Sequence, residues 1–222
     1  MLNEKNSMHS KRGWVLRVIL GYLLADSGGT AIIVREFVPI FTKEGRNFFA
    51  QISSIMYSFV ESLVHSELKH VETENIHISL KFLGNIHDAA VDEIYEAMKK
   101  VDFTPFKISI QGVGAFPSIS RPRVIWVGVR EGGDRLKEIF LKLEGELKKL
   151  GYKPEPKGFS PHITIARVKY LKKREALTRI LLQLENIDVG EMVVDSIRLK
   201  QSILTPKGPI YRTLKEVRGV NL

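Results

Sequence analysis

The spacing of apolar residues along the chain predicts helices and strands in mixed order. In four segments apolar residues recur every three or four positions, which is the period of a helix with one buried face. The predicted helices span residues 48–64, 88–101, 132–150 and 174–184. Shorter stretches alternate or are wholly apolar, as strands do. The predicted strands span residues 34–41, 76–83, 107–113, 124–129, 162–168, 191–199 and 211–217. This mixture, with several gaps of hairpin length, favours an α+β fold with mainly antiparallel sheets.

Two of the predicted strands carry the same four-residue pattern. The patterns are His77-Ile78-Ser79-Leu80 and His162-Ile163-Thr164-Ile165. Successive side chains of a strand point to opposite faces, so each strand presents an imidazole and a hydroxyl together and its aliphatic side chains on the other face. Two such strands side by side would gather two titratable imidazoles and two hydroxyl donors. This set of groups suits acid–base chemistry on a phosphate ester.

The repeated pattern is improbable as coincidence. The chain has six histidines, and the chance that two of them match the pattern by accident is on the order of 0.01. The other four, His9, His65, His70 and His87, lack a hydroxyl residue two positions later. Each motif strand is followed by a predicted helix, and each half of the chain has about four strands. The arrangement indicates two related lobes.

Composition narrows the chemistry further. The net charge of +9 favours an anionic partner such as nucleic acid, although a basic surface alone would give the same excess. The chain has no cysteine, which excludes disulfides, thiolate nucleophiles and thiolate metal sites and fits a cytoplasmic protein. The two histidines could share a metal ion. However, the sequence offers no neighbouring histidine or carboxylate cluster as a third ligand, so we expect a site without metal.

Residues 1–33 differ from the rest of the chain. An apolar run over residues 14–25 is interrupted by Arg17 and is shorter than the roughly 20 residues that a membrane span requires. Three interpretations stay open for this segment: a start codon placed too early in the gene model, a peripheral extension, or a targeting segment. We expect the folded body to begin with the strand at Val34 and to span residues 34–222 as one domain. We expect no membrane association.

The two motifs and their neighbours resemble a known family. Paired His-x-Ser/Thr-x patterns resemble those of the 2H phosphoesterase superfamily. Four longer blocks are similar to its RNA 2′,3′-cyclic phosphodiesterase branch, also called 2′-5′ RNA ligases: residues 77–84, 114–117, 121–126 and 161–167. The resemblance runs from about Val34 to the C-terminus. Ser79 stands where this branch usually has threonine, which removes a methyl group and keeps the hydroxyl.

The resemblance implies a fold and an activity. The fold would be two pseudo-symmetric α+β lobes, each a mainly antiparallel sheet with helices outside, enclosing a central cleft. The activity would be hydrolysis of terminal RNA 2′,3′-cyclic phosphates to 2′-phosphate ends, without a cofactor. By resemblance, His162 is the base that activates water and His77 the acid that protonates the leaving 3′ oxygen. The hydroxyls of Ser79 and Thr164 can donate hydrogen bonds to the non-bridging phosphate oxygens.

The substrate-binding residues rest on weaker patterns. By resemblance, Arg167 contacts phosphate or stacks on the terminal base, and Phe37 stacks on the base. Strict alternation puts Arg167 on the face opposite His162, so a bulge or the strand's end would have to turn it. Alternation puts Lys81 on the face of His77, where we expect a cation at the rim. We expect Trp126 in the core.

Other functions remain compatible with the sequence. The same groups could ligate or hydrolyse another cyclic or 2′-5′ phosphodiester, because 2′-5′ ligation is the reverse reaction with the two histidine roles exchanged. A protein that binds RNA ends without turning them over belongs to a different class, and the intact histidine and hydroxyl pairs argue against it. In every case the expected partner is RNA with a 2′,3′-cyclic phosphate or a 2′-5′ linkage. We expect the protein to be a monomer.

Overall fold

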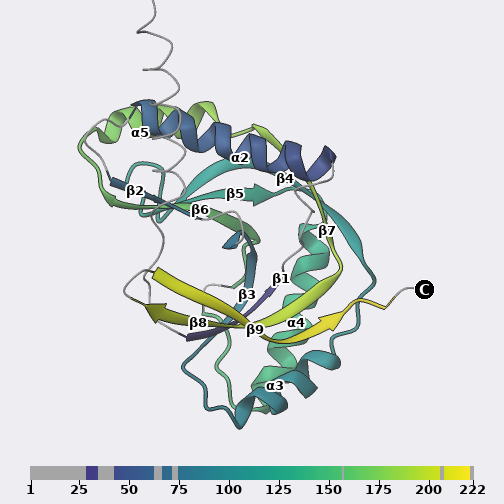
Figure 1. The fold of residues 1–222 in the computed structure, drawn as a ribbon. Helices are drawn as coiled ribbons and strands as arrows, with labels where there is room; N and C mark the ends of the chain where they lie inside the picture. Colours follow the sequence, from purple (N-terminus) through teal and green to yellow (C-terminus); the bar gives the residue numbers. More distant parts are fainter. Residues whose placement is uncertain are drawn as a thin grey trace, which may run out of the picture.

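The fold is a curled antiparallel sheet with helices packed against its outside (Figure 1). The structure, a computed structural model, describes residues 29–34, 43–62, 67–71, 75–156, 158–205 and 208–220. The strands are β1 (Gly29–Val34), β2 (Glu67–His70), β3 (Ile78–Gly84), β4 (Phe106–Phe116), β5 (Val124–Val129), β6 (His162–Tyr170), β7 (Asp188–Val194), β8 (Ser196–Thr205) and β9 (Gly208–Arg218). The helices are α2 (Lys43–Ser62), α3 (Ala90–Lys99), α4 (Gly133–Lys149) and α5 (Arg174–Gln183).

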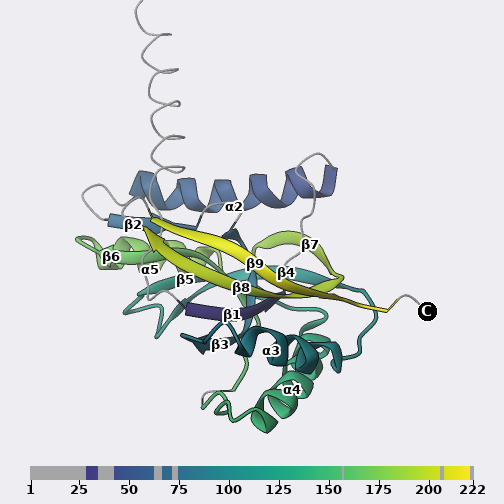
Figure 2. The same cartoon turned by 60° about the horizontal axis from the view of Figure 1, so that its bottom comes forward.

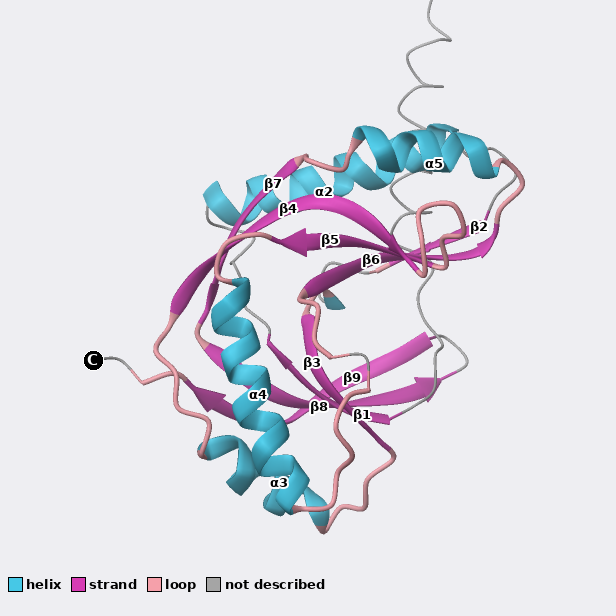
Figure 3. Ribbon diagram, turned by 180° about the vertical axis from the view of Figure 1, so that it is seen from behind, coloured by secondary structure: helices cyan, strands magenta, loops and turns pink. Residues whose placement is uncertain are grey.

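The sheet has two halves that meet at the strands carrying the histidine motifs. Its order is β7-β4-β5-β6-β3-β1-β8-β9, with β2 paired to β6 outside this path. We call β7, β4, β5 and β6 the β6 half, and β3, β1, β8 and β9 the β3 half. Helices α2 and α5 cover the β6 half, whereas α3 and α4 lie beside the β3 half (Figures 2 and 3). The expected α+β fold with two lobes is confirmed.

Most of the predicted elements form where their apolar spacing placed them. The clearest case is α4, whose apolar stripe repeats at three- and four-residue spacing and therefore faces the core along the whole helix. Its buried residues are Leu136, Ile139, Phe140, Leu143 and Leu147, each at most 4% exposed. Gly151 follows with φ at 87°, a left-handed conformation that ends helices and that glycine adopts without strain. Within the described residues, no helix combines the length and apolar character needed to cross a bilayer.

Three elements differ from the sequence prediction. The first strand begins earlier than expected: β1 spans Gly29–Val34, so residues 29–33 belong to the sheet rather than to the expected extension. Residues 1–28 and 35–42, which include Phe37 and the rest of the strand expected at residues 34–41, lie outside the described residues. The strand expected at residues 191–199 is two strands, β7 and β8, separated at Asp195. The four-residue strand β2 was not predicted, because a segment that short gives no measurable period.

His70 in β2 is a buried histidine that should make the fold sensitive to acid. It is 4% exposed, and its Nδ1 has no hydrogen-bond partner among the described residues. Burial disfavours the imidazolium and lowers the pKa of His70 from 6.5 to about 4. The unfolded chain therefore binds a proton at a higher pH than the folded chain does. The contribution of neutral His70 to the free energy of unfolding is therefore fully present above pH 6.5 and is lost as the pH falls toward 4.

We expect His70 to account for roughly 3 kcal/mol of lost stability between pH 7 and pH 4. Chemical denaturation at both pH values measures this loss. In His70→Leu the slope between pH 6.5 and 4 should be clearly shallower, because the titrating group is gone. His87→Leu, which removes an exposed histidine, should keep the slope of the unaltered protein. An unchanged slope in His70→Leu would contradict the assignment.

Candidate active site

The two histidine motifs lie on directly neighbouring strands. Ile78 of β3 pairs with Ile163 of β6 in antiparallel register, and both isoleucines are at most 1% exposed. Continuing this register by one residue in each direction puts His77 beside Thr164 and Ser79 beside His162. Opposed residues of an antiparallel pair share a face. All four chemistry-bearing side chains therefore lie on the face opposite the buried isoleucines, each imidazole next to the hydroxyl residue of the other motif.

Both motif strands bulge at the same point after the histidine. In β3 the register against β1 shifts so that Leu80 is unmatched, and in β6 the register against β5 shifts so that Ile165 is unmatched. A bulge adds one residue to one strand and re-aims the side chains that follow. Burial agrees with this, since two successive residues are buried in each strand: Leu80 and Lys81, and Ile165 and Ala166. The internal symmetry thus extends beyond the four-residue motifs.

The bulges settle the faces of Arg167 and Lys81. In β6 the extra residue returns Arg167, which pairs with Val124, to the face of His162 and Thr164. In β3 the same device turns Lys81 away from the face of His77. Lys81 is 5% exposed, so the expectation of a cation at the rim of the site is wrong. Phe82 stands five residues after His77, as Arg167 stands five residues after His162, and it is 67% exposed.

Main-chain carbonyls hold both imidazoles in the same tautomer. Nδ1 of His77 lies 2.6 Å from the carbonyl oxygen of Asn75, and Nδ1 of His162 lies 2.7 Å from that of Ser160. A carbonyl oxygen can only accept, so each Nδ1 must carry the proton and donate. Nε2 is then the nitrogen that accepts a proton in the neutral ring and delivers one from the charged ring. Each carbonyl belongs to the residue two positions before its histidine.

Aromatic side chains lie beside both imidazoles. Phe116 of β4 meets the imidazole of His162 edge-on at 5.0 Å between ring centroids, and Trp126 of β5 lies at 6.1 Å. On the other side, the ring of Tyr211 in β9 lies 6.5 Å from that of His77. Trp126 is half-buried beside the site, rather than in the core where the sequence placed it. Phe116 and Tyr211 were not predicted as site residues, because they enter from distant strands.

Gly114 makes room for the indole of Trp126. The two residues are paired between β4 and β5, and a Cβ atom at Gly114 would overlap the ring of Trp126. An aromatic ring that lies across a glycine on the neighbouring strand covers its exposed backbone. The sequence signal that could have found this contact is the glycine in an otherwise regular strand, which often marks a close approach.

The surroundings of His162 suit a base. Burial lowers the pKa of His162 below its ordinary value of 6.5, partly offset by the hydrogen bond to Ser160. A histidine with a lowered pKa is neutral at neutral pH, with Nε2 ready to accept a proton. The described residues contain no group of three or more His, Asp or Glu side chains placed to hold a metal ion.

The pH profile of the activity should report this environment. If His162 is the base, the acidic limb of kcat/KM lies below pH 6.5, since activity is lost only when His162 becomes protonated. Phe116→Ser should admit water beside the imidazole and move that limb upward, toward pH 6.5. Tyr170→Ser is the matched control, because Tyr170 is an exposed aromatic residue eight positions further along β6. A limb that moves equally in both variants would speak against the role of Phe116.

Five of the predicted site residues are therefore brought to one face of the sheet: His77, Ser79, His162, Thr164 and Arg167. Phe37 lies outside the described residues. The residues that sequence reasoning missed are Asn75 and Ser160, whose main-chain carbonyls accept hydrogen bonds from the imidazoles, and the aromatic neighbours Phe116 and Tyr211. The sequence carries no signal for Asn75 and Ser160, because they act through their main-chain carbonyls, which every residue type has.

Comparison with known structures supports the architecture. A solved structure from Thermus thermophilus superposes with a TM-score of 0.66 at 23% identity and covers 86% of this chain and 97% of that one. The crystal structure of E. coli LigT complexed with 3′-AMP also gives a TM-score of 0.66, at 16% identity, and covers 88% of this chain and 100% of that one. At these identities the likeness establishes the shared fold.

Sequence comparison is more specific. The RNA 2′,3′-cyclic phosphodiesterase of Aeropyrum pernix is 43% identical over 163 residues, which are 72% of this chain and 93% of that protein. The protein of the same name from Archaeoglobus fulgidus is 46% identical over 150 residues, 68% of this chain and 83% of that protein. A family model, LigT like Phosphoesterase, matches residues 46–126 and again residues 127–211. Each match contains one histidine motif, and the chain therefore belongs to the LigT-like phosphoesterase family.

Proposed function

We propose that the protein is an RNA 2′,3′-cyclic phosphodiesterase that opens the terminal cyclic phosphate of RNA to a 2′-phosphate. The single observation that carries this proposal is the antiparallel pairing of Ile78 with Ile163, a register that sets the two histidine–hydroxyl motifs side by side. The curated relatives from Aeropyrum pernix and Archaeoglobus fulgidus carry this name. The net charge of +9 also favours a nucleic-acid substrate.

The reaction needs a base on one side of the phosphorus and an acid on the other. Nε2 of His162 accepts a proton from water as the water oxygen bonds to phosphorus. The bond from phosphorus to the 3′ oxygen breaks in line with that attack, and His77 delivers the proton from its Nε2 to the leaving oxygen. The products are a 2′-phosphate and a 3′-hydroxyl. The lowered pKa of His162 supports its role as the base rather than the acid.

The other groups stabilise charge and hold the substrate. In the proposed mechanism the hydroxyls of Ser79 and Thr164 donate hydrogen bonds to the non-bridging oxygens, where negative charge grows. Arg167 binds the substrate from the same face, as a phosphate contact or as a planar cation against the terminal base. Phe37 is proposed as a second stacking group. No metal ion takes part in this scheme.

The proposal extends to the organisation of the chain. Residues 34–222 would form one bilobal catalytic domain, to which residues 29–33 contribute the start of β1. The protein would act as a monomer in the cytoplasm, where RNA ends are available. The absence of cysteine from the chain is compatible with that compartment.

A product analysis tests the proposed function. The protein is incubated with a nucleoside 2′,3′-cyclic phosphate, with and without EDTA, and the product is identified by phosphorus NMR. We expect the 2′-phosphate in both samples. A 3′-phosphate would assign the reaction to a different phosphodiesterase class. Loss of activity in EDTA with recovery on adding a metal ion would replace the two-histidine scheme by a metal-dependent one. Binding of the cyclic phosphate without turnover would indicate an RNA-end-binding protein.

A further inference from the structure

The two catalytic strands touch each other over a very short distance. Among the described residues, β3 and β6 pair at Ile78 and Ile163 alone, whereas each of them pairs over several residues with its other neighbour. A single pair fixes the register but gives little resistance to a change in the angle between the strands. The distance between the two imidazoles therefore depends on additional ties between the halves of the sheet.

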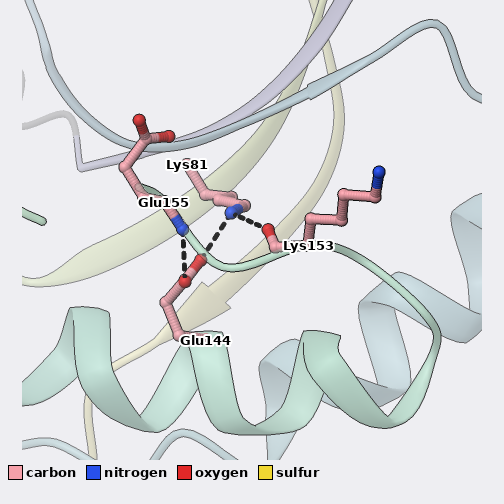
Figure 4. Close-up of polar contacts among 4 residues, drawn as sticks. All are labelled: Lys81, Glu144, Lys153 and Glu155. Atoms are coloured by element: carbon pink, nitrogen blue, oxygen red, sulfur yellow. Dashed lines mark hydrogen bonds and ion pairs between the residues drawn. The ribbon is translucent and has the colours of Figure 1, made fainter. Parts of the chain in front are cut away.

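Lys81 provides such a tie from the strand of His77. The bulge in β3 turns its side chain into the space between β3 and α4, where its Nζ lies 2.7 Å from Oε1 of Glu144. The same Nζ donates a hydrogen bond of 2.6 Å to the main-chain oxygen of Lys153. The two side chains of the ion pair are only 5% and 14% exposed, so water screens the contact little. Figure 4 shows the ammonium between its two partners.

Glu144 extends the tie to the segment that precedes His162. Its Oε2 accepts a hydrogen bond of 2.8 Å from the main-chain nitrogen of Glu155. The side chains of Lys153 and Glu155 point away from the contact, and only their backbone groups take part (Figure 4). Further along, Phe159 stacks on Phe140 of α4 at 4.8 Å between centroids. The segment then reaches Ser160, whose carbonyl fixes the ring of His162.

We infer that Lys81 is a positioning residue: together with Glu144 it fastens the segment before His162 to the strand that follows His77, and so sets the relative placement of the two imidazoles. The inference rests on the proposed function, because it assigns a purpose to that relative placement. The proposed role requires a cationic side chain at the bulge, as Lys81 provides. The equivalent position of the second motif is Ala166, which is buried and cannot form an ion pair.

The effect of losing Lys81 should appear in kcat. A misplacement of about 1 Å between reacting groups costs up to about 10²-fold in rate. We expect Lys81→Met to lower kcat about 10- to 10²-fold on a nucleoside 2′,3′-cyclic phosphate, with KM changed less than about threefold. Lys81→Arg, which keeps the charge and the donors, should restore most of the rate. Lys153→Met is the matched control: it removes a lysine side chain that takes no part in the contact and leaves the main-chain carbonyl that accepts from Lys81, so it should retain the original kcat.

A double variant separates positioning from simple loss of stability. Lys81→Met leaves Glu144 buried without its partner, which destabilises proteins. Lys81→Met combined with Glu144→Leu removes both charges, and replacing a buried ion pair by apolar residues is often tolerated. We expect this double variant to recover the thermal stability of the unaltered protein while kcat stays low, because it lacks both the contact of Lys81 with Lys153 and the contact of Glu144 with Glu155. Recovery of both stability and kcat would overturn the inference.

A spectroscopic readout makes the test independent of activity. Nitrogen-15 shifts of the imidazoles report which ring nitrogen carries the proton. In the unaltered protein His162 should show the Nδ1–H tautomer, and in the double variant it should show a mixture, whereas His77 should be unchanged. If the unaltered protein fails to open the cyclic phosphate, the proposed function fails while this measurement still decides the positioning role. If it opens the substrate and the double variant matches it in both kcat and tautomer, only the positioning role fails.

Discussion

Replacing His162 with alanine is expected to lower turnover of a nucleoside 2′,3′-cyclic phosphate about 10²- to 10⁴-fold, and replacing His77 is expected to do the same. Both imidazoles have Nδ1 bound to a main-chain carbonyl, which leaves Nε2 as the proton-transferring atom on each side of the site. Neither histidine can substitute for the other, because in-line opening needs a base and an acid on opposite sides of the phosphorus. His87→Ala, which removes an exposed histidine, should leave kcat unchanged.

The pH profiles of the two variants should distinguish their roles. The residual activity of His162→Ala should lose the acidic limb of kcat/KM, since no base remains to be protonated at this position. The residual activity of His77→Ala should lose the basic limb, since the acid that would be deprotonated is gone. The variant that combines His77→Ala with His162→Ala should be little slower than either single variant, because the effects of residues that act as a unit are strongly non-additive. Full activity in either single variant would end the two-histidine account.

The sequence predicted the parts of the site that depend on local pattern. His77 shares a face with Ser79, and His162 shares a face with Thr164, as alternation within each strand predicts. The antiparallel pairing of Ile78 with Ile163 then brings the two motifs together. The apolar stripe of α4 was equally readable, since its five positions from Leu136 to Leu147 face the core, whereas Leu150 after the helix is 39% exposed. Local period is informative wherever an element has one buried face along its whole length.

The sequence could not predict features that depend on register between strands. Strict alternation puts both Arg167 and Lys81 on the wrong face, because a bulge changes alternation and is specified by the neighbouring strand rather than by the strand itself. The bulge in β6 turns Arg167 back to the face of His162, which its expected role in substrate binding requires. Likewise, the closeness of Phe116 to His162 arises from the pairing of β4 with β5 and of β5 with β6.

Breaks in a strand were also hidden from the sequence. The segment 191–199 reads as one continuous strand, yet it forms the end of β7 on the β6 half and the start of β8 on the β3 half of the sheet. The chain changes halves at Asp195, where apolar residues on both sides are buried: Val194 and Ile197 are at most 1% exposed. The spacing of apolar residues indicates that both strands are buried, but it does not indicate which neighbouring strands they pair with.

Removing either hydroxyl of the motifs is expected to lower kcat about 10²-fold, the usual effect of deleting one hydrogen-bond donor to a developing negative charge. The variants are Ser79→Ala and Thr164→Val, the second of which keeps the shape of the side chain. The hydroxyl residues lie beside the opposite histidines in the register of β3 and β6, so each can reach a phosphate held between the imidazoles. KM should change less than kcat, because the charge on the non-bridging oxygens is greatest in the transition state.

Conservative exchanges and phosphorothioate substrates make this prediction specific. Ser79→Thr and Thr164→Ser keep the donor and should retain most of the rate, which also tests whether serine in the first motif is functionally equivalent to threonine. In the two diastereomers of a nucleoside 2′,3′-cyclic phosphorothioate, sulfur replaces one or the other non-bridging oxygen and accepts hydrogen bonds poorly. Each hydroxyl variant should therefore lose the discrimination against one diastereomer only. If Ser79→Ala and Thr164→Val each lose less than about threefold in kcat, the hydroxyls do not bind the oxygens that gain charge, and the imidazoles must open the phosphate without them.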